Sequence, residues 1–389
     1  MTESQIKNLL AEYPTPFYVF DSAELRRRVT YLKSALPEDI ELCYAVKANT
    51  FISKAICDLI DRYEVCSPGE MAICQKQSIP AQKLVISGVY KTPKIIEAHI
   101  LSDSCAGYYT AESLEQYELL KTSAAKAGKR IKLLLRLTSG NQFGMNEDDI
   151  KELIKADKDS DIIDIRGIQF FSGTQKTSMK KYKREISHLD SFMQKLEAET
   201  GFETKELEYG TGFPVIYFEG EKEFDEAGFL ADFSELLGSI EYKCHITLEV
   251  GRSIAASCGS YFTKAVDIKT NHSQNYAIMD GGIHHIAYFG QFMAMKHPYF
   301  ELYPARSGET KEWNLCGSLC TVNDLLVKQL PIADFKAGDT VIFKNAGAYC
   351  VTEGISLFLS RALPAVIMLD EKGKPHLMRG AFETYNLNS

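Results

Sequence analysis

The stretch LCYAVKAN, residues 42–49, is a short apolar run that carries one lysine, Lys47. Burying an ammonium group costs free energy unless a neighbour neutralises it or the amine reacts. A strand lysine that reaches out to solvent is the ordinary interpretation. The alternative is that Lys47 forms an imine, because desolvation lowers the pKa of an amine and leaves it nucleophilic. The rest of the chain has to decide between the two.

Seven more short apolar runs follow along the chain. They are YEVCS, KLVISGV, CAGYYT, KLLLRLT, DIRGIQFFSG, ELEYGTGF and HITLEVGR. Helix-like segments such as SKAICDLIDR and PGEMAICQKQ follow most of them. Eight strand–helix units between about residue 40 and about residue 255 predict an α/β fold, a (β/α)8 TIM-like barrel. A doubly wound sheet is the alternative, but it usually has fewer strands and an early glycine-rich turn.

The pattern changes after Arg252, where strand-like runs such as QNYAIMD and DTVIFKNAGAYC are separated by turns. This pattern of short strand-like runs and turns predicts a second, mostly antiparallel β domain. The N-terminal TPFYVFD is another strand that can join that sheet. The expected domains are therefore a barrel over residues 24–265 and a β domain made of residues 1–23 and 266–389.

Composition excludes several classes of protein. The 389 residues carry a net charge of -8, which argues against a nucleic-acid binder. The apolar runs are too short to span a bilayer, and acidic and polar residues interrupt the N-terminus where a signal peptide would be apolar. The ten cysteines show no C-x-x-C pair or other metal-ligand spacing. We therefore expect a cytoplasmic protein with reduced thiols and no metal, membrane or nucleic-acid partner.

Polar groups fall at the carboxyl ends of the predicted barrel strands, where such barrels place their catalytic groups. Lys47 closes the first strand, Phe170–Gln175 the sixth, Tyr209–Pro214 the seventh, and Glu249 and Arg252 the eighth. Glycine-rich turns at the last strands bind phosphate in these barrels. Each signal alone is weak, since a GTG turn is often only a turn and an arginine often only pairs with a surface carboxylate. Together they fit pyridoxal phosphate, which needs a lysine, a phosphate cradle and a carboxylate that keeps its pyridine nitrogen protonated.

The motifs YAVKAN, EVCSPGE, FFSGTQ, YGTGFP, EVGR and GAY, in this order, resemble those of the barrel-type pyridoxal-phosphate decarboxylases. That family includes the diaminopimelate, ornithine and arginine decarboxylases and shares its barrel with alanine racemase. The resemblance covers nearly the whole chain. It implies that Lys47 is the imine lysine and that the cofactor is pyridoxal 5′-phosphate.

The same resemblance implies roles for the residues that bind the cofactor. Phe171 stands where the family has a histidine that stacks on the cofactor ring, and Thr174 stands where it has a phosphate-binding serine. The remaining implied cofactor residues are Gly210, Thr211, Gly212, Glu249, Gly251, Arg252 and Tyr349. Thr211 replaces the middle glycine of the family's triple-glycine turn. Arg252 and Tyr349 are also expected to contact the substrate.

CTVND, Cys320–Asp324, falls where the family has CESGD. In the family the cysteine and the aspartate enter from the partner subunit, which implies a homodimer with shared active sites and a catalytic Cys320. Thr321 and Asp324 are expected to contact the substrate. Thr321 carries no charge, whereas the diaminopimelate enzymes have a glutamate there and the ornithine enzymes an aspartate. Nor does DGGIHHIAYFGQFM contain the arginine expected after DGG.

These departures are similar to a branch that includes the butirosin-pathway decarboxylase, whose glutamyl substrate is carried by an acyl carrier protein. The expected reaction is pyridoxal-phosphate-dependent decarboxylation of an amino acid or amino-acid derivative, with a carrier-linked, siderophore-pathway or antibiotic-pathway substrate as candidates. Diaminopimelate decarboxylation, racemisation on the same fold and a non-catalytic cofactor carrier remain alternatives. His284 and His285, after the DGG turn, have either a structural role or a substrate contact.

Overall fold

The structure, a computed structural model, describes residues 1–389 and divides them into two compact units. The barrel unit comprises residues 28–214 and 225–254, and the sheet unit comprises residues 1–27, 215–224 and 255–389. The excursion 215–224, which the sequence analysis assigned to the barrel, packs within the sheet unit. There the Asn345 side chain donates to the Ile216 carbonyl at 3.1 Å, and Phe218 pairs with Pro298 in an isolated bridge.

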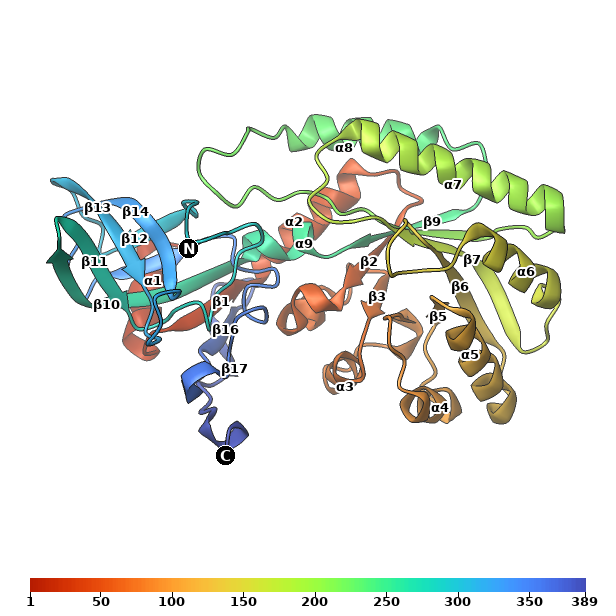
Figure 1. Ribbon diagram of the computed structural model, residues 1–389, viewed down its shortest axis with the longest axis horizontal. Helices are drawn as coiled ribbons and strands as arrows, with labels where there is room; N and C mark the ends of the chain where they lie inside the picture. Colours follow the sequence, from red (N-terminus) through yellow and green to blue (C-terminus); the bar gives the residue numbers. More distant parts are fainter. The chain divides into compact units, whose positions relative to one another are not determined.

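Eight parallel strands close into the predicted barrel, in which each strand pairs with the next and β9 pairs with β2 (Figure 1). They are β2 (Glu41–Ala45), β3 (Arg62–Val65), β4 (Leu84–Ile86), β5 (Tyr108–Ala111), β6 (Ile131–Leu137), β7 (Ile163–Phe171), β8 (Glu206–Gly210) and β9 (His245–Val250). Each run named in the sequence analysis supplies one strand. The fold prediction is therefore confirmed.

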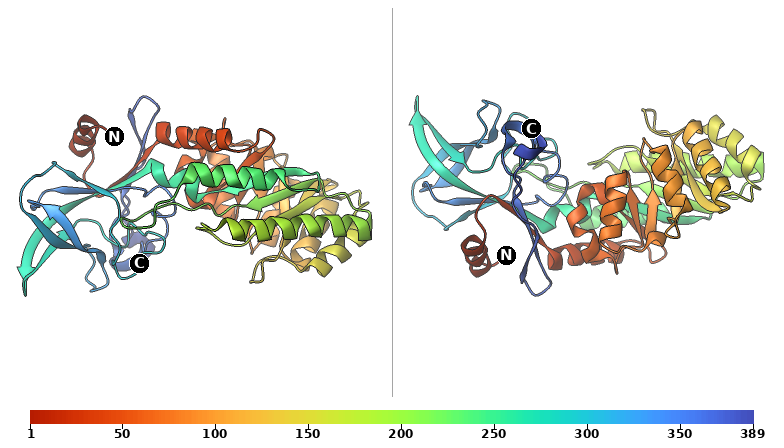
Figure 2. Two further views of the ribbon diagram at one scale, coloured as in Figure 1. Left: turned by 90° about the horizontal axis from the view of Figure 1, so that it is seen from above. Right: turned by 90° about the horizontal axis from the view of Figure 1, so that it is seen from below.

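Helices follow the strands on the outside of the barrel, and Figures 1 and 2 show α7 and α8 side by side. They are α3 (Pro68–Lys76), α4 (Pro93–Leu101), α5 (Leu114–Ala127), α6 (Glu147–Asp157), α7 (Met179–Thr200) and α8 (Glu226–Gly238), with α2 (Ser22–Ala35) leading into β2. Local sequence fixes where they begin. In α3, for example, Ser67 accepts the Glu70 amide at 3.2 Å and Glu70 accepts the Cys66 amide at 2.7 Å. No helix has the length and apolar character required to cross a membrane.

Side chains alternate between the barrel interior and the helices. Tyr209 of β8 faces the helices, because its ring lies 6.3 Å from Phe170 and 6.4 Å from Phe233 of α8. Glu208 and Gly210, its neighbours, therefore face the interior. An apolar layer formed by Cys43, Val85, Tyr108 and Leu134 fills part of this interior. The strands of this layer are not all neighbours, so these side chains meet across the barrel.

The sheet unit is a nine-stranded sheet with the order β14-β13-β11-β10-β1-β16-β17, to which β15 and β12 are added beside β10. Its strands are β1 (Phe17–Asp21), β10 (Gly259–Asn271), β11 (Gln274–Met279), β12 (Phe300–Tyr303), β13 (Thr310–Cys316), β14 (Leu325–Ala333), β15 (Thr340–Phe343), β16 (Ala365–Leu369) and β17 (Pro375–Arg379). All pairs are antiparallel except β1–β16 and β11–β13. TPFYVFD joins this sheet as β1, as expected. Helix α1 (Glu3–Glu12) packs Ile6 and Leu9 into its core.

Candidate active site

Lys47 lies in a single 3-10 turn, Val46–Ala48, directly after β2. Its ammonium nitrogen is 2.5 Å from Glu64 Oε2 and 3.3 Å from Glu249 Oε1. Glu64 belongs to β3 and Glu249 to β9, and these are the two strands that pair with β2. The side chain of Lys47 remains 39% exposed, whereas both carboxylates are buried. The strand ends thus hold an accessible amine between two carboxylates.

The two carboxylates differ in their electrostatics because one ammonium cannot neutralise both. Burial alone would raise the pKa of Glu64, but attraction to Lys47 and hydrogen bonds outweigh it and hold that pKa well below its usual range. Burial, followed by repulsion from Glu64, raises the pKa of Glu249 to about 7. Glu64 is therefore the charged partner of Lys47. A second cation near Glu249 would stabilise the charged form of that carboxylate.

Glu64 is not among the site residues predicted from the sequence, although the run YEVCS carries a signal for it. A charged residue in the middle of a buried strand needs a partner, and Glu64 is 2% exposed. Only the pairing of β2 with β3 and β9 shows that this partner is Lys47. Cys66, two residues later, places its thiol 3.2 Å from Glu64 Oε1 and 3.7 Å from Lys47 Nζ.

The two predicted phosphate turns meet in the structure. Arg252 Nε donates to Thr174 Oγ1 at 3.3 Å, which joins the end of β9 to the turn after β7. Thr211 turns its hydroxyl back to the Glu249 carbonyl at 3.2 Å, so its side chain points away from the turn's inner face. Gly212 has a φ of +59°, and a Cβ on it would lie 2.1 Å from the Gly173 carbonyl oxygen. Thr211 can therefore replace a glycine here, whereas Gly212 cannot be replaced without strain.

Phe171 lies against Gly210. A Cβ on Gly210 would be 2.5 Å from the Phe171 ring, so a larger residue would displace it. Phe171 alternates with Phe170, which stacks on Tyr209 on the helix side, and so faces the barrel interior. Its half-buried ring provides a flat apolar face at the end of β7.

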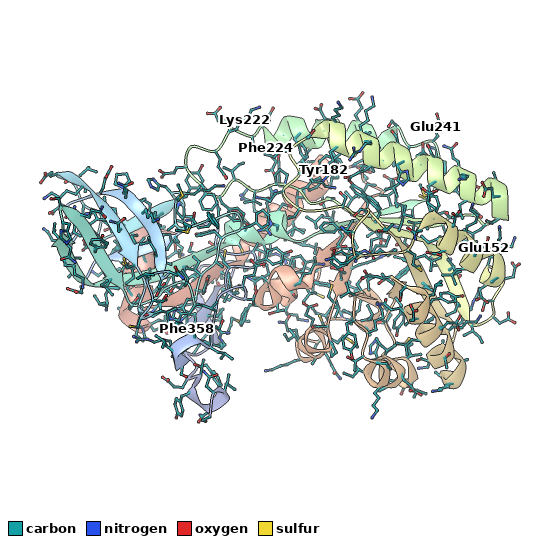
Figure 3. The ribbon with its side chains drawn as sticks, in the orientation of Figure 1. Glu152, Tyr182, Lys222, Phe224, Glu241 and Phe358 are labelled. Carbon is teal, nitrogen blue, oxygen red and sulfur yellow. The ribbon has the colours of Figure 1, made fainter.

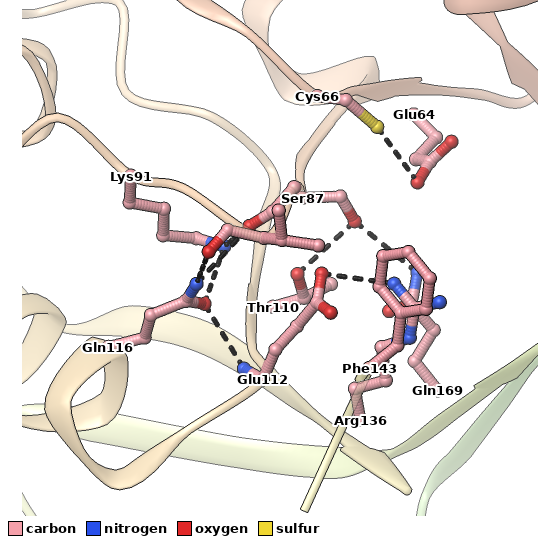
Figure 4. Close-up of polar contacts among 12 residues, drawn as sticks. Glu64, Cys66, Ser87, Lys91, Thr110, Glu112, Gln116, Arg136, Phe143 and Gln169 are labelled. Carbon is pink, nitrogen blue, oxygen red and sulfur yellow. Dashed lines mark hydrogen bonds and ion pairs between the residues drawn. The ribbon is translucent and has the colours of Figure 1, made fainter. Parts of the chain in front are cut away.

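A polar network that the sequence analysis did not identify lies at the ends of β4 to β7 (Figure 4). Arg136 Nη1 donates to Glu112 Oε1 at 3.0 Å, and Gln169 Nε2 lies 3.3 Å from Ser87 Oγ and donates to Glu208 Oε1 at 2.8 Å. Three side-chain oxygens of this network, Glu112 Oε2, Gln169 Oε1 and Glu208 Oε2, are buried without a partner in the protein. Buried polar atoms without partners are rare, and they indicate that this face of the interior receives a polar group that the chain itself does not supply.

Four predicted site residues belong to the sheet unit. Cys320 is exposed and Thr321 is half-buried, in a tight turn in which the Thr321 amide donates to the Leu319 carbonyl at 2.8 Å. Tyr349 is half-buried with a φ of +66°, a conformation that only the surrounding structure can maintain for a tyrosine. The Gly347 amide, two residues earlier, donates to the Ala256 carbonyl at 3.0 Å and holds the start of the GAY turn.

Asp324 is 3% exposed, and its carboxylate is turned into its own loop. Its Oδ1 accepts the Ile283 amide at 2.8 Å and its Oδ2 accepts the Leu319 amide at 2.7 Å. The contact between Asp324 and the substrate remains a prediction. In the structure the Asp324 carboxylate holds the loop together by accepting hydrogen bonds from two backbone amides.

The two histidines after the DGG turn differ in their contacts. His285 has a structural position, with its ring nitrogens 3.1 Å from Tyr261 OH and 2.8 Å from the Ala362 carbonyl. The His284 ring packs 3.7 Å from the His285 ring, and burial lowers the pKa of His284 to about 3. His284 is therefore neutral, and its predicted contact with substrate remains open to test.

The residues at the barrel strand ends fit pyridoxal 5′-phosphate. Lys47 supplies an accessible amine, and Glu249 supplies a buried carboxylate whose pKa is raised by burial and by the neighbouring Glu64. Arg252 and the Gly212 turn form a site suited to an anion. The buried oxygens of Glu112 and Gln169 without partners are consistent with a polar group bound above them.

Comparisons with known proteins agree with this chemistry. Residues 22–256 match the pyridoxal binding domain of the pyridoxal-dependent decarboxylases. Over 366 residues the chain is 26% identical to diaminopimelate decarboxylase of Aquifex aeolicus, covering 88% of this chain and 84% of that protein. Over 410 residues it is 26% identical to L-glutamyl-(BtrI acyl-carrier protein) decarboxylase of Niallia circulans, covering 97% and 94%.

Solved structures of diaminopimelate decarboxylases have a similar fold. The crystal structure of Helicobacter pylori diaminopimelate decarboxylase complexed with L-lysine superposes with a TM-score of 0.86 at 22% identity, covering 98% of both chains. The family match spans more than half of this chain and includes the strand that carries Lys47. The chain belongs to the pyridoxal-dependent decarboxylase family, and it is a pyridoxal-phosphate-dependent amino-acid decarboxylase of the barrel type.

Proposed function

We propose that the protein removes the α-carboxylate of an amino acid whose far end carries no free ammonium group. The observation that carries the assignment of the site is the amine of Lys47, held within 3.3 Å of both Glu64 and Glu249 at the barrel strand ends. The bound cofactor supplies an electron sink for the carbanion left when CO2 departs. The chain's own residues bind that cofactor, hold its protons and exclude water.

Each barrel residue then has a definite task. Lys47 attaches the cofactor, and Glu64 keeps its amine in place. Glu249 holds a proton at the pyridine nitrogen, because a cation there supplies the counter-charge it lacks. The residues assigned to the phosphate and the ring face are Phe171, Thr174, Gly210, Thr211, Gly212, Gly251 and Arg252.

Cys320 is assigned as the acid that returns a proton to the substrate carbon, from the partner subunit of a homodimer. Its exposed position on the sheet unit supports a role toward another chain. Large apolar side chains are also exposed on the same unit, and Val322, two residues after Cys320, is 95% exposed. Apolar side chains gathered on a surface mark contact sites. In the segment after Tyr349, the exposed large apolar side chains are Ile355, Leu357, Phe358 and Leu359.

The charge of the loop Gly317–Asp324 supports this substrate class. Asp324 is its only charged residue, and two backbone amides occupy its carboxylate. Thr321 offers a hydroxyl. An ammonium group buried here would keep most of its desolvation cost, several kcal/mol when unpaired. A neutral thioester, amide or other polar extension fits better, as in a glutamyl group carried by an acyl carrier protein.

Two alternatives are diaminopimelate decarboxylation and racemisation. The first would need an anionic side chain and a cationic side chain for the two distal charges. Thr321 stands where the diaminopimelate enzymes have a glutamate, and residues 283–293 after the DGG turn contain no arginine. The second uses an arginine near the pyridine nitrogen in this fold, and the corresponding position here is Glu249. We also propose that the protein works in a reducing, cytoplasmic compartment, because all ten cysteines carry free thiols.

The test incubates the holoenzyme with free glutamate, a glutamyl thioester of a carrier-arm analogue, diaminopimelate, lysine and ornithine, and measures CO2 release and loss of optical activity. We expect CO2 from the neutral-ended substrate. Lys47→Ala should lose both the absorbance band of the imine and turnover. An imine band that persists in Lys47→Ala would overturn the assignment of this lysine. Loss of chirality without CO2 would establish a racemase.

A further inference from the structure

Lys176 follows the predicted phosphate turn FFSGTQ and is buried, with 4% of its surface exposed. Its ammonium nitrogen lies 2.9 Å from Glu185 Oε2 on α7, 3.0 Å from Tyr209 OH on β8 and 3.3 Å from Ser172 Oγ. Ser172 and Tyr209 also donate to Glu185, each at 2.6 Å. We call these four residues, Ser172, Lys176, Glu185 and Tyr209, the clip.

The clip lies on the helix side of the barrel wall. Tyr209 faces α7 and α8, and the Lys176 ammonium stands 4.6 Å from the centre of the Tyr182 ring, on α7 (Figure 3). The ammonium therefore points away from the barrel interior, where Lys47 and Glu249 lie. Lys176 cannot contact the reacting atoms and can act only through the elements it joins.

Those elements are the two turns assigned to the cofactor phosphate. The Lys176 amide donates to the Gly212 carbonyl at 2.9 Å, and Tyr182 OH lies 3.2 Å from the Lys176 carbonyl and 3.0 Å from the Thr211 carbonyl. The turns are so close that a Cβ on Gly212 would lie 2.1 Å from the Gly173 carbonyl. A shift of Lys176 therefore moves both turns together.

We propose that Lys176, paired with Glu185, is a positioning residue that fixes the spacing of the two phosphate-binding turns. A buried ion pair is seldom more stable than well-packed apolar residues of the same size, so stability alone is a weak reason for one here. The ion pair contributes geometric specificity. Hydrogen bonds are directional, and the four side chains of the clip can satisfy theirs in only one arrangement. This inference rests on the proposed assignment of the turns to phosphate.

The test uses two variants and a control. Lys176→Met leaves Glu185 buried without a cation, and Lys176→Met/Glu185→Leu removes the whole pair. Lys180→Met is the matched control, because Lys180 is an exposed lysine four residues later, in the first turn of α7. For each apoprotein, the urea midpoint and the dissociation constants of pyridoxal 5′-phosphate and of pyridoxal, which lacks the phosphate, are measured. The 31P resonance of the bound cofactor is recorded as well.

We expect Lys176→Met to lower the urea midpoint and the double variant to recover it. In the double variant the dissociation constant of pyridoxal 5′-phosphate should still rise at least about tenfold, equivalent to ~1.4 kcal/mol. The 31P resonance should shift, whereas pyridoxal binding and the Lys180→Met control stay unchanged. Recovery of phosphate-dependent affinity together with stability would show a merely structural pair, and equal losses for both ligands would show that the clip does not act on the phosphate. Either result overturns the inference.

Failure of the proposed function gives a different result. In that case the wild-type protein would bind neither ligand, or would bind both with equal affinity, before any variant is compared. A preference of the wild-type protein for the phosphorylated ligand is therefore the first measurement.

Discussion

Lys47 shows how a single residue acquires its chemistry from its neighbours. Its amine faces Glu64 at 2.5 Å and Glu249 at 3.3 Å, and attraction to the amine helps to hold the pKa of Glu64 low while the pKa of Glu249 rises to about 7. One carboxylate is thus committed to the amine, and the other is available for a second positive charge. Two acidic residues of similar type receive separate roles because only one of them has a full partner.

Glu249→Gln tests the second of these roles. The amide keeps the shape of the side chain but cannot carry the negative charge that stabilises a protonated ring nitrogen. We expect turnover to fall at least ~10²-fold, the order of a lost acid–base or electrostatic group. Steady-state CO2 release and the cofactor's absorbance spectrum provide the check, and an unchanged rate with an unchanged spectrum would mean that another group protonates the ring.

Glu208 gives a prediction about pH and stability. It is fully buried, and burial, followed by repulsion from Glu249 and Glu206, raises its pKa from an ordinary 4.5 to about 8. The folded chain therefore holds this proton through a pH range in which the unfolded chain has lost it. Because the folded state binds more protons there, stability decreases as pH rises from about 4.5 to about 8.

Glu208→Gln should remove this part of the pH dependence while keeping an acceptor for Gln169. We expect the variant apoprotein to gain stability over the wild type at pH 8.5 and to gain less at pH 5. Urea unfolding of both apoproteins at the two pH values measures the difference. Parallel pH profiles would contradict the prediction. Glu249, whose pKa is also raised, contributes a pH dependence of the same sign in both proteins.

At the scale of elements, the sequence predicts what depends on short-range pattern. Each barrel strand is a short apolar run followed by a turn, so the order β2 to β9 and the position of Lys47 at a strand end follow from the pattern. The segment 215–224 is different, because the Glu219 amide pairs with the His297 carbonyl far along the chain, at 2.8 Å. No local pattern predicts such a contact.

The candidate site shows the same division. The meeting of Thr174 and Arg252 was expected from strand-end geometry. The roles of Glu64 and Lys176 were not expected from the sequence. The partner of a charged residue in a strand or loop depends on which strands pair and on which helix packs behind them. Glu64 needs β2 beside β3, and Lys176 needs Glu185 of α7.

Thr321→Glu tests the proposal that the loop Gly317–Asp324 sets the substrate class. The Asn323 amide donates to the Thr321 hydroxyl at 3.4 Å, so it is the one backbone donor near the new side chain. The added carboxylate has two oxygens, and at least one of them remains free to pair with an ammonium group. We expect lysine, ornithine and diaminopimelate to improve relative to the neutral-ended substrate, measured as the ratio of kcat/KM values. The wild-type enzyme should use these amino acids poorly. A wild-type kcat/KM of roughly 10⁴ M⁻¹s⁻¹ or more for any of them would contradict the proposal.

At the scale of the whole molecule, the chain divides its proposed catalytic groups between two units. Lys47 and Glu249 belong to the barrel unit, and Cys320 and Tyr349 belong to the sheet unit. Cys320 and the neighbouring Val322 are exposed, as is Phe358 in the segment after Tyr349. An isologous dimer would cover such a surface twice and would bring each exposed cysteine to the other chain.

A hybrid of two inactive variants tests this shared site. Lys47→Ala removes the amine, and Cys320→Ala removes the acid, so each homodimer lacks activity at both sites. In a mixed dimer one site combines the two defects, and the other combines the intact lysine of one chain with the intact cysteine of its partner. Random reassortment makes half of the dimers mixed, each with one of two sites restored, so activity should recover to about a quarter of wild type. Subunit exchange is verified with differently tagged chains, and exchange without recovered CO2 release would show that each active site lies within one chain.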